Sequence, residues 1–535
     1  MNFSSSVLLG LAIIGISIGV KIQKILILHH KGKIIPGPPS DPLLGNILDL
    51  QKNRGFPNYL PMLHSQYGKI TKLWLGSSNF VVSISDPNLV AEVAGTLQSL
   101  PTTIKQPFTW VGDEIYFFRQ PQEAKAIKIK LSRLLSGETL DCLREATQKH
   151  TTILLDLWTS SPGGQTIDVR DELSQVSLTI IGDCLIGEEF SNSSLGEEIS
   201  ASFIEVLKGV QPRSEEVIPA IWDSSYWKWK KTVSHLHQCI YDSIEQRKQD
   251  GNLNQRTDFL SRVLREKDDR GESLFTKEEI RATIISFLFG GFDAVAVALS
   301  SACYILAQHP EIQAQAQAEV DRVLGGRLAN FDDFKALEYL NQVLKETMRI
   351  NPPSSVTMRE VESDFELAGY HIQKGTILFI SISALHNDPE VWLAPEKFLP
   401  ERFSPENEKQ RSRYAYIPFG VGSRGCIGGN FAMTQLQLML PMLLQKFSIQ
   451  EIRDRAVISK SEASAVSLRT RLELLTVSLR QSTLLSKCFG IRLPLPSMKS
   501  ILLCPSQTRQ EFERANDRQQ DDRATLLFVA RSHRQ

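Results

Sequence analysis

The sequence has no net charge, since its 535 residues include 60 Lys and Arg against 60 Asp and Glu. A balanced chain lacks the long-range attraction that nucleic acids require, so no nucleic-acid partner is expected. Cysteine is also scarce, and the odd total of 7 shows neither metal-ligand nor disulfide spacing. All but Cys426 are interpreted as reduced thiols in a cytosol-facing body; they are Cys142, Cys184, Cys239, Cys303, Cys488 and Cys504.

Internal repeats and long flexible linkers are absent from the N-terminal hinge to about residue 480. Short runs at 70–74 and 80–84 predict strands, whereas most of the middle of the chain has helical period and composition. The clearest helix follows a capping box of Thr276 and Glu279 and ends near Gln308. At about 48 Å long and apolar on nearly all sides, it is expected to be buried.

An apolar run without charge occupies residues 3–20, and lysines follow it from Lys21 to Lys33. This pattern predicts a membrane-spanning helix whose C-terminal side faces the cytosol. A cleaved signal peptide is the alternative, but no small-residue cleavage site closes the run. A Pro-Gly-Pro-Pro hinge at 36–39 cannot continue a helix. Residues 1–34 are therefore expected to be an anchor with a basic flank.

The C-terminal segment 481–535 differs in composition from the rest of the chain. It mixes leucine-rich pieces with a polar stretch at 510–523, after a predicted strand at 469–479. A poorly ordered tail is expected. A wrongly assigned gene end is the alternative, and no function can be assigned to this segment.

One decamer, Phe419 to Gly428, reads FGVGSRGCIG and places Cys426 between two glycines, two residues after Arg424. Glycine is needed where a backbone turns sharply or lies against a flat ring. A cysteinate ligand donates electron density to haem iron and favours O–O cleavage. The alternative for any lone cysteine is a small buried hydrophobe in a glycine-rich turn.

The decamer resembles the haem-binding loop of the cytochrome P450 family, Phe-Gly-x-Gly-x-Arg-x-Cys-x-Gly, at every specified position. The anchor and hinge resemble those of the family's microsomal members. The resemblance runs from Pro36 to Arg480 and implies a mainly α fold with a small β portion. It predicts one large helical haem domain at 35–480, with the long central helix over the haem. It implies haem b as the cofactor, with Cys426 as the axial ligand of the iron.

The resemblance extends to other cofactor residues. Phe419, Gly420 and Gly428 occupy the family's positions in the haem loop. Arg424 and Arg359 match its ligands to the propionates, which are anions and attract basic side chains. The usual Trp-x-x-x-Arg of an earlier helix is missing: Lys128 stands at the Trp position and Ser132 at the Arg position. Lys128 is retained as a cofactor-binding candidate whose contacts the sequence leaves open.

A charge triad is implied by two further motifs. Glu346 and Arg349, three residues apart, lie on one helix face, which alone is typical of an ordinary surface ion pair. Arg402 follows in a Pro-Glu-Arg-Phe motif at the family's interval. By resemblance, the three residues form a buried structural brace for the cysteine loop. Loss of one partner would then strand a buried charge at a cost of about 3–5 kcal/mol.

The long helix departs from the family pattern Ala/Gly-Gly-x-Asp/Glu-Thr, because residues 290–294 read GGFDA. The resemblance assigns Gly291 to close approach of oxygen or substrate and Asp293 to a proton relay. Ala294 lacks the usual threonine hydroxyl, although proton transfer needs a donor within hydrogen-bond reach or one water away. Three interpretations stay open: a substrate hydroxyl or ordered water replaces the hydroxyl, oxygen activation is leaky, or the enzyme does not use dioxygen.

The leading hypothesis is a membrane-anchored haem-thiolate monooxygenase. It would hydroxylate or epoxidise a lipophilic small molecule, such as a terpenoid, a steroid or another secondary metabolite. Electrons would come from NADPH through NADPH-cytochrome P450 reductase, with cytochrome b5 as an optional second partner. Apolar segments carrying Phe108, Trp110, Phe117 and Trp222 are expected to line the substrate pocket. A monomer with a cytosolic haem domain is expected. The anchored N-terminus and the lack of an arginine-rich amphipathic presequence favour the endoplasmic reticulum membrane over mitochondria.

Two other function classes are weighed against this hypothesis. One is a haem enzyme on the same fold that acts without net oxygen insertion, as an isomerase, dehydratase or desaturase, which Ala294 favours. The other is a non-catalytic haem-binding or ligand-carrying protein. A complete cysteine loop and an intact brace argue against the second class, because such a protein would need neither.

Overall fold

The computed structural model describes residues 34–77, 79–101, 108–160, 169–214, 223–268, 270–452 and 525–530. Its tertiary contacts divide the chain into two compact units. Unit 1 holds the chain up to Pro101, Ser355–Leu393 and Ser412–Ser423; unit 2 holds Thr102–Ser354, Ala394–Arg411 and the chain from Arg424 onward. Residues 1–33 of the expected anchor and the strand expected at 469–479 lie outside the described residues.

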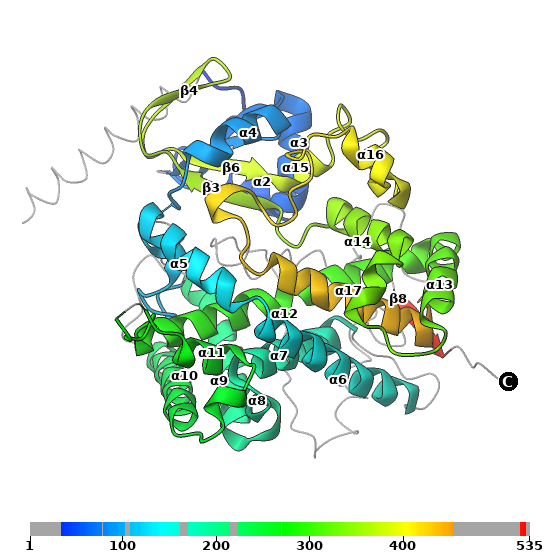
Figure 1. Ribbon diagram of the computed structural model, residues 1–535. Helices are drawn as coiled ribbons and strands as arrows, with labels where there is room; N and C mark the ends of the chain where they lie inside the picture. The colour runs from blue at the N-terminus through cyan, green and yellow to red at the C-terminus, as the bar shows by residue number, and fades with distance from the viewer. Residues whose placement is uncertain are drawn as a thin grey trace, which may run out of the picture. The chain divides into compact units, whose positions relative to one another are not determined.

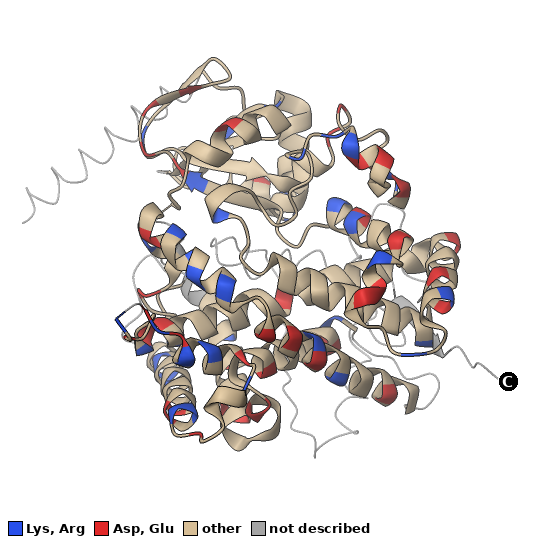
Figure 2. Ribbon diagram, in the orientation of Figure 1, with Lys and Arg blue, Asp and Glu red and all other residues tan. Residues whose placement is uncertain are grey.

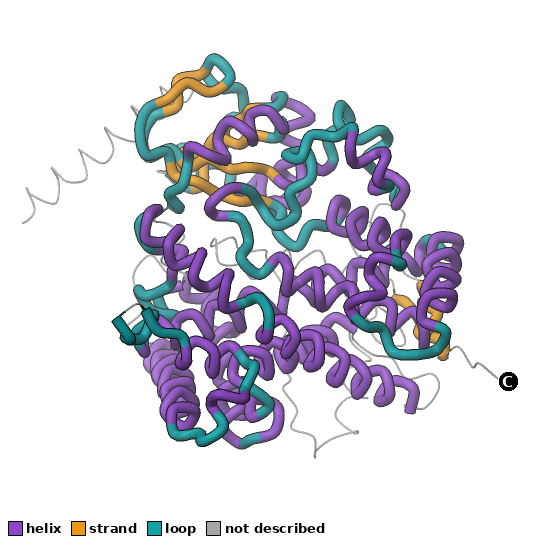
Figure 3. Tube along the Cα trace, viewed as in Figure 1, coloured by secondary structure: helices purple, strands orange, loops and turns teal. Residues whose placement is uncertain are grey.

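Unit 1 contains a four-stranded sheet in the order β1-β2-β6-β3, coloured orange in Figure 3. The strands β1 and β2 form an antiparallel hairpin, β2 pairs in parallel with β6, and β6 pairs antiparallel with β3. Their bounds are β1 Ile70–Leu75, β2 Asn79–Ile84, β3 Val356–Glu360 and β6 Ile377–Ser381; β4 Phe365–Leu367 and β5 Tyr370–Ile372 form a separate hairpin. The strands expected at 70–74 and 80–84 are thus confirmed.

The core of unit 1 forms around β6, whose five residues are all buried. Leu378 and Ile380 of β6 belong to one apolar cluster with Val82 and Ile84 of β2. The helices of this unit are α2 Ile47–Lys52, α3 Phe56–Tyr67, α4 Pro87–Thr96 and α15 Ile382–His386. A strand buried on both faces reads as a continuous apolar run, which explains the sequence ILFIS.

Unit 2 is almost entirely helical (Figure 1). Its helices are α5 Pro121–Leu134, α6 Glu138–Ser160, α7 Val169–Ile186, α8 Glu189–Asn192, α9 Ser194–Ser214, α10 Ser224–Lys248, α11 Phe259–Arg265, α12 Lys277–Gln308, α13 Pro310–Leu324, α14 Glu338–Ile350, α16 Pro405–Lys409 and α17 Gly429–Lys446. Basic and acidic residues are interspersed over these helices (Figure 2). The mainly α fold with a small β portion is confirmed.

The long central helix is α12, and its predicted start is confirmed. Thr276 Oγ1 accepts a hydrogen bond from the Glu279 amide at 3.1 Å, and Glu279 Oε2 accepts one from the Thr276 amide at 2.9 Å. Among the described residues, α12 alone has the length and hydropathy of a membrane span. Because α12 packs against α7, α14 and α17, we interpret it as the core helix of unit 2.

Part of the C-terminal segment, which was expected to be poorly ordered, forms a strand. Strand β8 (Thr525–Ala530) pairs antiparallel with β7 (Phe447–Ile452). Six residues of the segment expected to be a poorly ordered tail therefore form a strand. Their sequence, TLLFVA, has the β-branched and aromatic residues that strands prefer. The rest of 481–535 lies outside the described residues.

Candidate functional site

Cys426 lies in unit 2, two residues before Gly428, the N-cap of α17. Its side chain is exposed, but the surrounding protein raises the pKa of the thiol by desolvation. The Gly428 N–H and the nearby Lys128 act in the opposite direction and lower that pKa. A helix N-terminus also favours negative charge, and the thiolate is the form that binds metals. The surroundings are therefore compatible with an accessible sulfur that binds a metal as its thiolate.

Two cations border the cysteine loop within unit 2. Lys128 of α5 donates from Nζ to the carbonyl oxygen of Gly425 at 2.7 Å. Arg424 donates from Nη2 to the carbonyl oxygen of Arg119 at 3.2 Å. The structure thus gives Lys128 a contact with the residue that precedes Cys426, which the sequence had left open.

Tyr116 is a neighbour of this loop that the sequence analysis did not single out. It opens the short 3-10 helix η3 (Tyr116–Phe118). Burial raises the pKa of its hydroxyl, the charge of Cys426 raises it further, and Arg424 lowers it. Its hydroxyl therefore lies within electrostatic reach of both residues. No motif identifies Tyr116, because its loop has no regular spacing.

Three glycines of the decamer differ in their backbone conformation. Gly420 and Gly422 have φ of 69° and 73°, in the left-handed region that glycine adopts without strain. A Cβ on Gly422 would also lie 2.2 Å from the carbonyl oxygen of Ala94, within unit 1. Gly428 has φ of −88°, which any residue can adopt. The backbone turn therefore requires glycine at the first two positions and not at the third.

Arg359 holds the first half of the decamer inside unit 1. It lies on β3, is 1% exposed, and donates from Nη2 to the carbonyl oxygen of Val421 at 2.8 Å. Its Nη1 donates to the carbonyl oxygen of Met358 at 2.7 Å and to Thr357 Oγ1 at 3.0 Å. Phe419, two residues before Val421, is half-buried in the same unit. The strand and the loop are thus joined through one buried guanidinium.

The three residues expected to form a brace are in contact, with Glu346 and Arg349 fully buried and the Arg402 side chain 9% exposed. Glu346 and Arg349 of α14 are both 0% exposed. Arg349 donates to the two Glu346 carboxylate oxygens at 2.7 and 2.8 Å, and Arg402 Nε donates to Glu346 Oε1 at 3.2 Å. The Leu399 amide donates to the same Oε1 at 3.0 Å. The interpretation as a surface ion pair is therefore excluded.

A narrow open face runs along the buried helix α12. Gly290 is exposed, and a Cβ there would have no atom of the described residues within 4 Å. Ala294 and Val297 follow at helical spacing and are half-buried. Gly291 faces elsewhere: its Cβ would lie 2.9 Å from Cγ1 of Ile181 on α7. Of the two glycines, Gly290 thus has the open space, while Gly291 permits close helix packing.

Asp293, the expected proton relay, forms an ion pair with Arg170 in the first turn of α7. Both side chains are largely buried, with 14% and 12% exposed. Because 123 residues separate them, no local spacing could have indicated this pair. Between Ser286 and Ser300, α12 carries no hydroxyl side chain. The carboxylate of Asp293 is therefore the ionisable group nearest in sequence to Ala294.

An aromatic cluster lies beside the open face of α12. Phe289, next to Gly290, has its ring 5.3 Å from that of Phe108 and 6.5 Å from that of Trp110. The ring of Phe203 on α9 lies 5.6 Å from Phe292 and 6.4 Å from Trp110. Phe108 and Trp110, expected in a pocket wall, are buried in this cluster, at 3% and 4% exposed, and their role in a pocket stays a prediction.

Some of the expected wall lies outside the described residues. Trp222 is among these, and the side chain of Phe117 is not described.

A partly buried set of hydrogen bonds holds the backbone at Trp110. His237 of α10 donates from Nε2 to the carbonyl oxygen of Trp110 at 2.8 Å, and its Nδ1 accepts from Arg281 of α12 at 2.9 Å. Arg281 also donates to Glu114 Oε2 at 2.9 Å. Burial, reinforced by the Arg281 charge, lowers the pKa of His237 to about 4. The imidazole is therefore neutral near pH 7 and can make both hydrogen bonds.

Comparison with known proteins agrees with the motifs. The family model described as Cytochrome P450 matches residues 35–477. The chain is 30% identical over 444 residues to Cytochrome P450 3A41 of Mus musculus, covering 79% of this chain and 87% of that protein. It is 28% identical over 446 residues to Cytochrome P450 3A31 of Mesocricetus auratus, covering 81% and 88%. It is 27% identical over 470 residues to Cytochrome P450 3A7 of Homo sapiens, covering 84% and 92%.

The buried brace generates a stability prediction. Replacing Glu346 by Ala leaves the guanidiniums of Arg349 and Arg402 without their carboxylate, so we expect a loss of about 3–5 kcal/mol and a lower haem content. Haem absorbance per unit of protein and the midpoint of thermal inactivation measure both effects. Lys345→Ala is the matched control, because its ion pair with Glu408 leaves the side chains 33% and 37% exposed. Equal behaviour of the two variants would contradict a bracing role.

Proposed function

Because the chain belongs to the cytochrome P450 family of haem-thiolate monooxygenases, we propose that it hydroxylates or epoxidises a lipophilic small molecule with dioxygen. Haem b supplies the activation of oxygen, and electrons reach it from NADPH through a reductase. The observation that carries the proposal is the accessible Cys426 sulfur just before the N-terminus of α17, in a loop to which Lys128 donates a hydrogen bond at the Gly425 carbonyl oxygen. Terpenoids, steroids and other secondary metabolites are the substrate classes that we propose.

We assign the cofactor contacts to residues already at the loop. Cys426 is the proposed axial ligand, and Arg424 and Arg359 are proposed to neutralise the propionates. Lys128 is proposed to hold the loop through Gly425, close enough to contribute positive charge to the same anions. Phe419, Gly420 and Gly428 would shape the loop against the flat macrocycle. The Glu346, Arg349 and Arg402 brace would keep the segment before the loop in place.

The substrate is proposed to lie at the open face of α12, beside Gly290 and Ala294. The aromatic side chains of Phe108, Trp110 and Phe289 offer apolar contacts there. We propose that Asp293 relays protons through water, and that Arg170 holds its carboxylate in position. An ordered water or a substrate hydroxyl would supply the donor that Ala294 lacks. Gly291 contributes by letting α12 approach α7 closely.

A second candidate function is favoured by Ala294. Without a hydroxyl between Ser286 and Ser300, this helix lacks the usual donor for oxygen activation. An isomerase, a dehydratase or a desaturase on the same fold would not insert oxygen into its product. An isomerase or a dehydratase would also need no reductase, which separates these two from the leading proposal.

The electron donor is proposed to dock near α5. This helix carries Lys125, Lys128, Lys130 and Arg133 against one acidic residue, Glu123, and its basic residues are visible in Figure 2. Lys128 contacts the cysteine loop, so the positive helix lies beside the proposed iron ligand. An acidic surface on a reductase, or on cytochrome b5, would be attracted to it.

The proposed setting is the endoplasmic reticulum. Residues 1–34 would anchor a monomer, with the haem domain in the cytosol.

The function is tested by expressing the full chain with a reductase in a eukaryotic host, supplied with lipophilic precursors under heavy-isotope dioxygen. We expect a reductase-dependent product that carries the label, and loss of that product in Cys426→Ala but not in Cys142→Ser. A product without the label would overturn oxygen insertion. Independence from the reductase would then indicate isomerisation or dehydration, whereas dependence would indicate desaturation.

The proton relay is tested by Asp293→Asn, which keeps the size of the side chain and removes its acid. We expect turnover to fall about 100-fold and the solvent deuterium isotope effect to increase, because positioned proton donors contribute about that much to rate. Asp171→Asn, at an exposed carboxylate on α7, is the control. Unchanged turnover in Asp293→Asn would exclude this carboxylate from proton delivery.

Docking on α5 is tested by Lys125→Glu, which reverses one exposed charge of that helix. We expect about tenfold slower reduction by the reductase at low salt, with the difference shrinking as ionic strength rises. Reduction by dithionite should not change. Lys228→Glu on α10 is the control for a general charge effect. If both variants slow reduction equally, the docking surface is not α5.

A further inference from the structure

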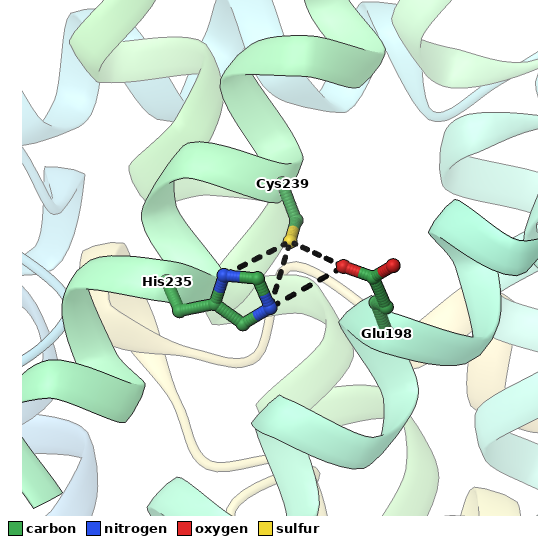
Figure 4. A group of neighbouring side chains, drawn as sticks. All are labelled: Glu198, His235 and Cys239. Atoms are coloured by element: carbon green, nitrogen blue, oxygen red, sulfur yellow. Dashed lines mark hydrogen bonds and ion pairs between the residues drawn. The ribbon is translucent and has the colours of Figure 1, made fainter. Parts of the chain in front are cut away.

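Away from the cysteine loop, three side chains that commonly bind metals converge where α9 meets α10. Glu198 projects from α9, while His235 and Cys239 project from α10 (Figure 4). A spacing of four residues places His235 and Cys239 on the same face of α10. Within the part of the chain that the structure describes, no other group of His, Cys, Asp and Glu side chains meets this geometry.

The distances between their ligand atoms match the edges of a tetrahedron around zinc. Zinc bonds of about 2.0–2.2 Å to nitrogen or oxygen and about 2.3 Å to sulfur place nitrogen about 3.4 Å from oxygen, and both about 3.6 Å from sulfur. In the structure, His235 Nε2 lies 3.3 Å from Glu198 Oε2 and 3.6 Å from Cys239 Sγ. Glu198 Oε2 lies 3.8 Å from the same sulfur. Each edge thus agrees with the zinc geometry to within about 0.2 Å.

The donor atoms of the three side chains, nitrogen, sulfur and oxygen, indicate which metals the cluster can bind. Imidazole and thiolate suit zinc and other late transition metals, whereas magnesium and calcium prefer oxygen ligands alone. Cys239 is buried, but the side chains of His235 and Glu198 are 53% and 55% exposed, so an ion can enter from solvent. We propose that Glu198, His235 and Cys239 bind a zinc ion whose fourth coordination position is open to water.

Binding requires one rearrangement. The sulfur of Cys239 is nearly equidistant from the two ring nitrogens of His235, at 3.6 and 3.9 Å. The ring must therefore turn to direct the Nε2 lone pair at an ion shared with the sulfur. Its half-exposed position permits that rotation.

The ion would join two helices that hold the aromatic cluster. The helices α9 and α10 run antiparallel, because Trp229 Nε1 donates to the carbonyl oxygen of Val206 at 3.0 Å, further along α9 and earlier on α10 than the cluster. Helix α9 carries Phe203, and α10 holds Trp110 through His237. A zinc ion would therefore fix the spacing between the helices behind both aromatic residues.

The test uses the untagged full-length holoenzyme, equilibrated with zinc chloride and then dialysed against zinc-free buffer. We expect one zinc ion for each haem by elemental analysis. The zinc X-ray absorption edge, which is separate from that of iron, should show one sulfur neighbour at about 2.3 Å and nitrogen or oxygen at about 2.0–2.2 Å.

Single-residue variants decide whether this cluster is the site. Glu198→Gln and Cys239→Ser should weaken zinc binding at least about 100-fold, since changes even outside the ligand set cost about 10–100-fold. Glu197→Gln, at the adjacent exposed carboxylate on α9, should bind as the unaltered protein does. If Cys239→Ser loses its haem, Glu198→Gln still tests the site, because Glu198 is half-exposed and its replacement should leave the fold intact. No retained zinc, or equal retention in all variants, would overturn the proposal.

Discussion

The buried carboxylate of Glu346 is the constraint on which the proposed haem site depends. With no exposed surface, this charge has to be neutralised inside the protein, and Arg349, Arg402 and the Leu399 amide all direct donors at it. Arg349 also donates to the carbonyl oxygen of Pro395 at 2.8 Å, and Arg402 to that of Ala394 at 2.7 Å. One charge therefore ties the segment 394–402, which precedes the cysteine loop in the chain, to α14. Buried ion pairs contribute little net stability, but removing one partner is costly because it leaves an uncompensated buried charge.

Helix α12 combines two demands that conflict in a simple amphipathic helix. Its length and apolar composition serve the core of unit 2, yet the same helix leaves Gly290 exposed and Ala294 half-buried. The two adjacent glycines have different surroundings. Gly291 packs against Ile181, whereas a side chain at Gly290 would have no neighbouring atom among the described residues. Asp293 is the one acidic residue in the middle of this helix, and Arg170 balances its charge from α7. The departure from the family pattern at Ala294 thus lies next to the one acidic residue in the middle of an apolar helix.

Local patterns predicted much of this structure. The capping box at Thr276 and the strands at 70–74 and 80–84 followed from spacing and composition, whereas the fold class followed from the family resemblance of the cysteine loop. Contacts between distant segments could not be predicted in this way, because the two partners are far apart in sequence and no short motif contains both. Arg170 with Asp293, and Tyr116 near Cys426, are of this kind. The proposed zinc ligands are a further example. Cysteine spacing alone indicated an ordinary thiol at Cys239, although His235 lies four residues before it on the same helix. Glu198 comes from another helix, so no local pattern could include it.

The order of strands in unit 1 has a consequence for how the chain folds as the ribosome releases it. Ser83 of β2 pairs with Phe379 of β6, 296 residues later. The four-stranded sheet therefore cannot form until most of the polypeptide has been synthesised. Until then the β1–β2 hairpin presents an unpaired, largely apolar edge, which is a site for aggregation or chaperone binding. The first half of the cysteine loop belongs to this same unit. Because the cysteine loop follows β6 in the sequence, the proposed haem site is completed only after both segments have been synthesised.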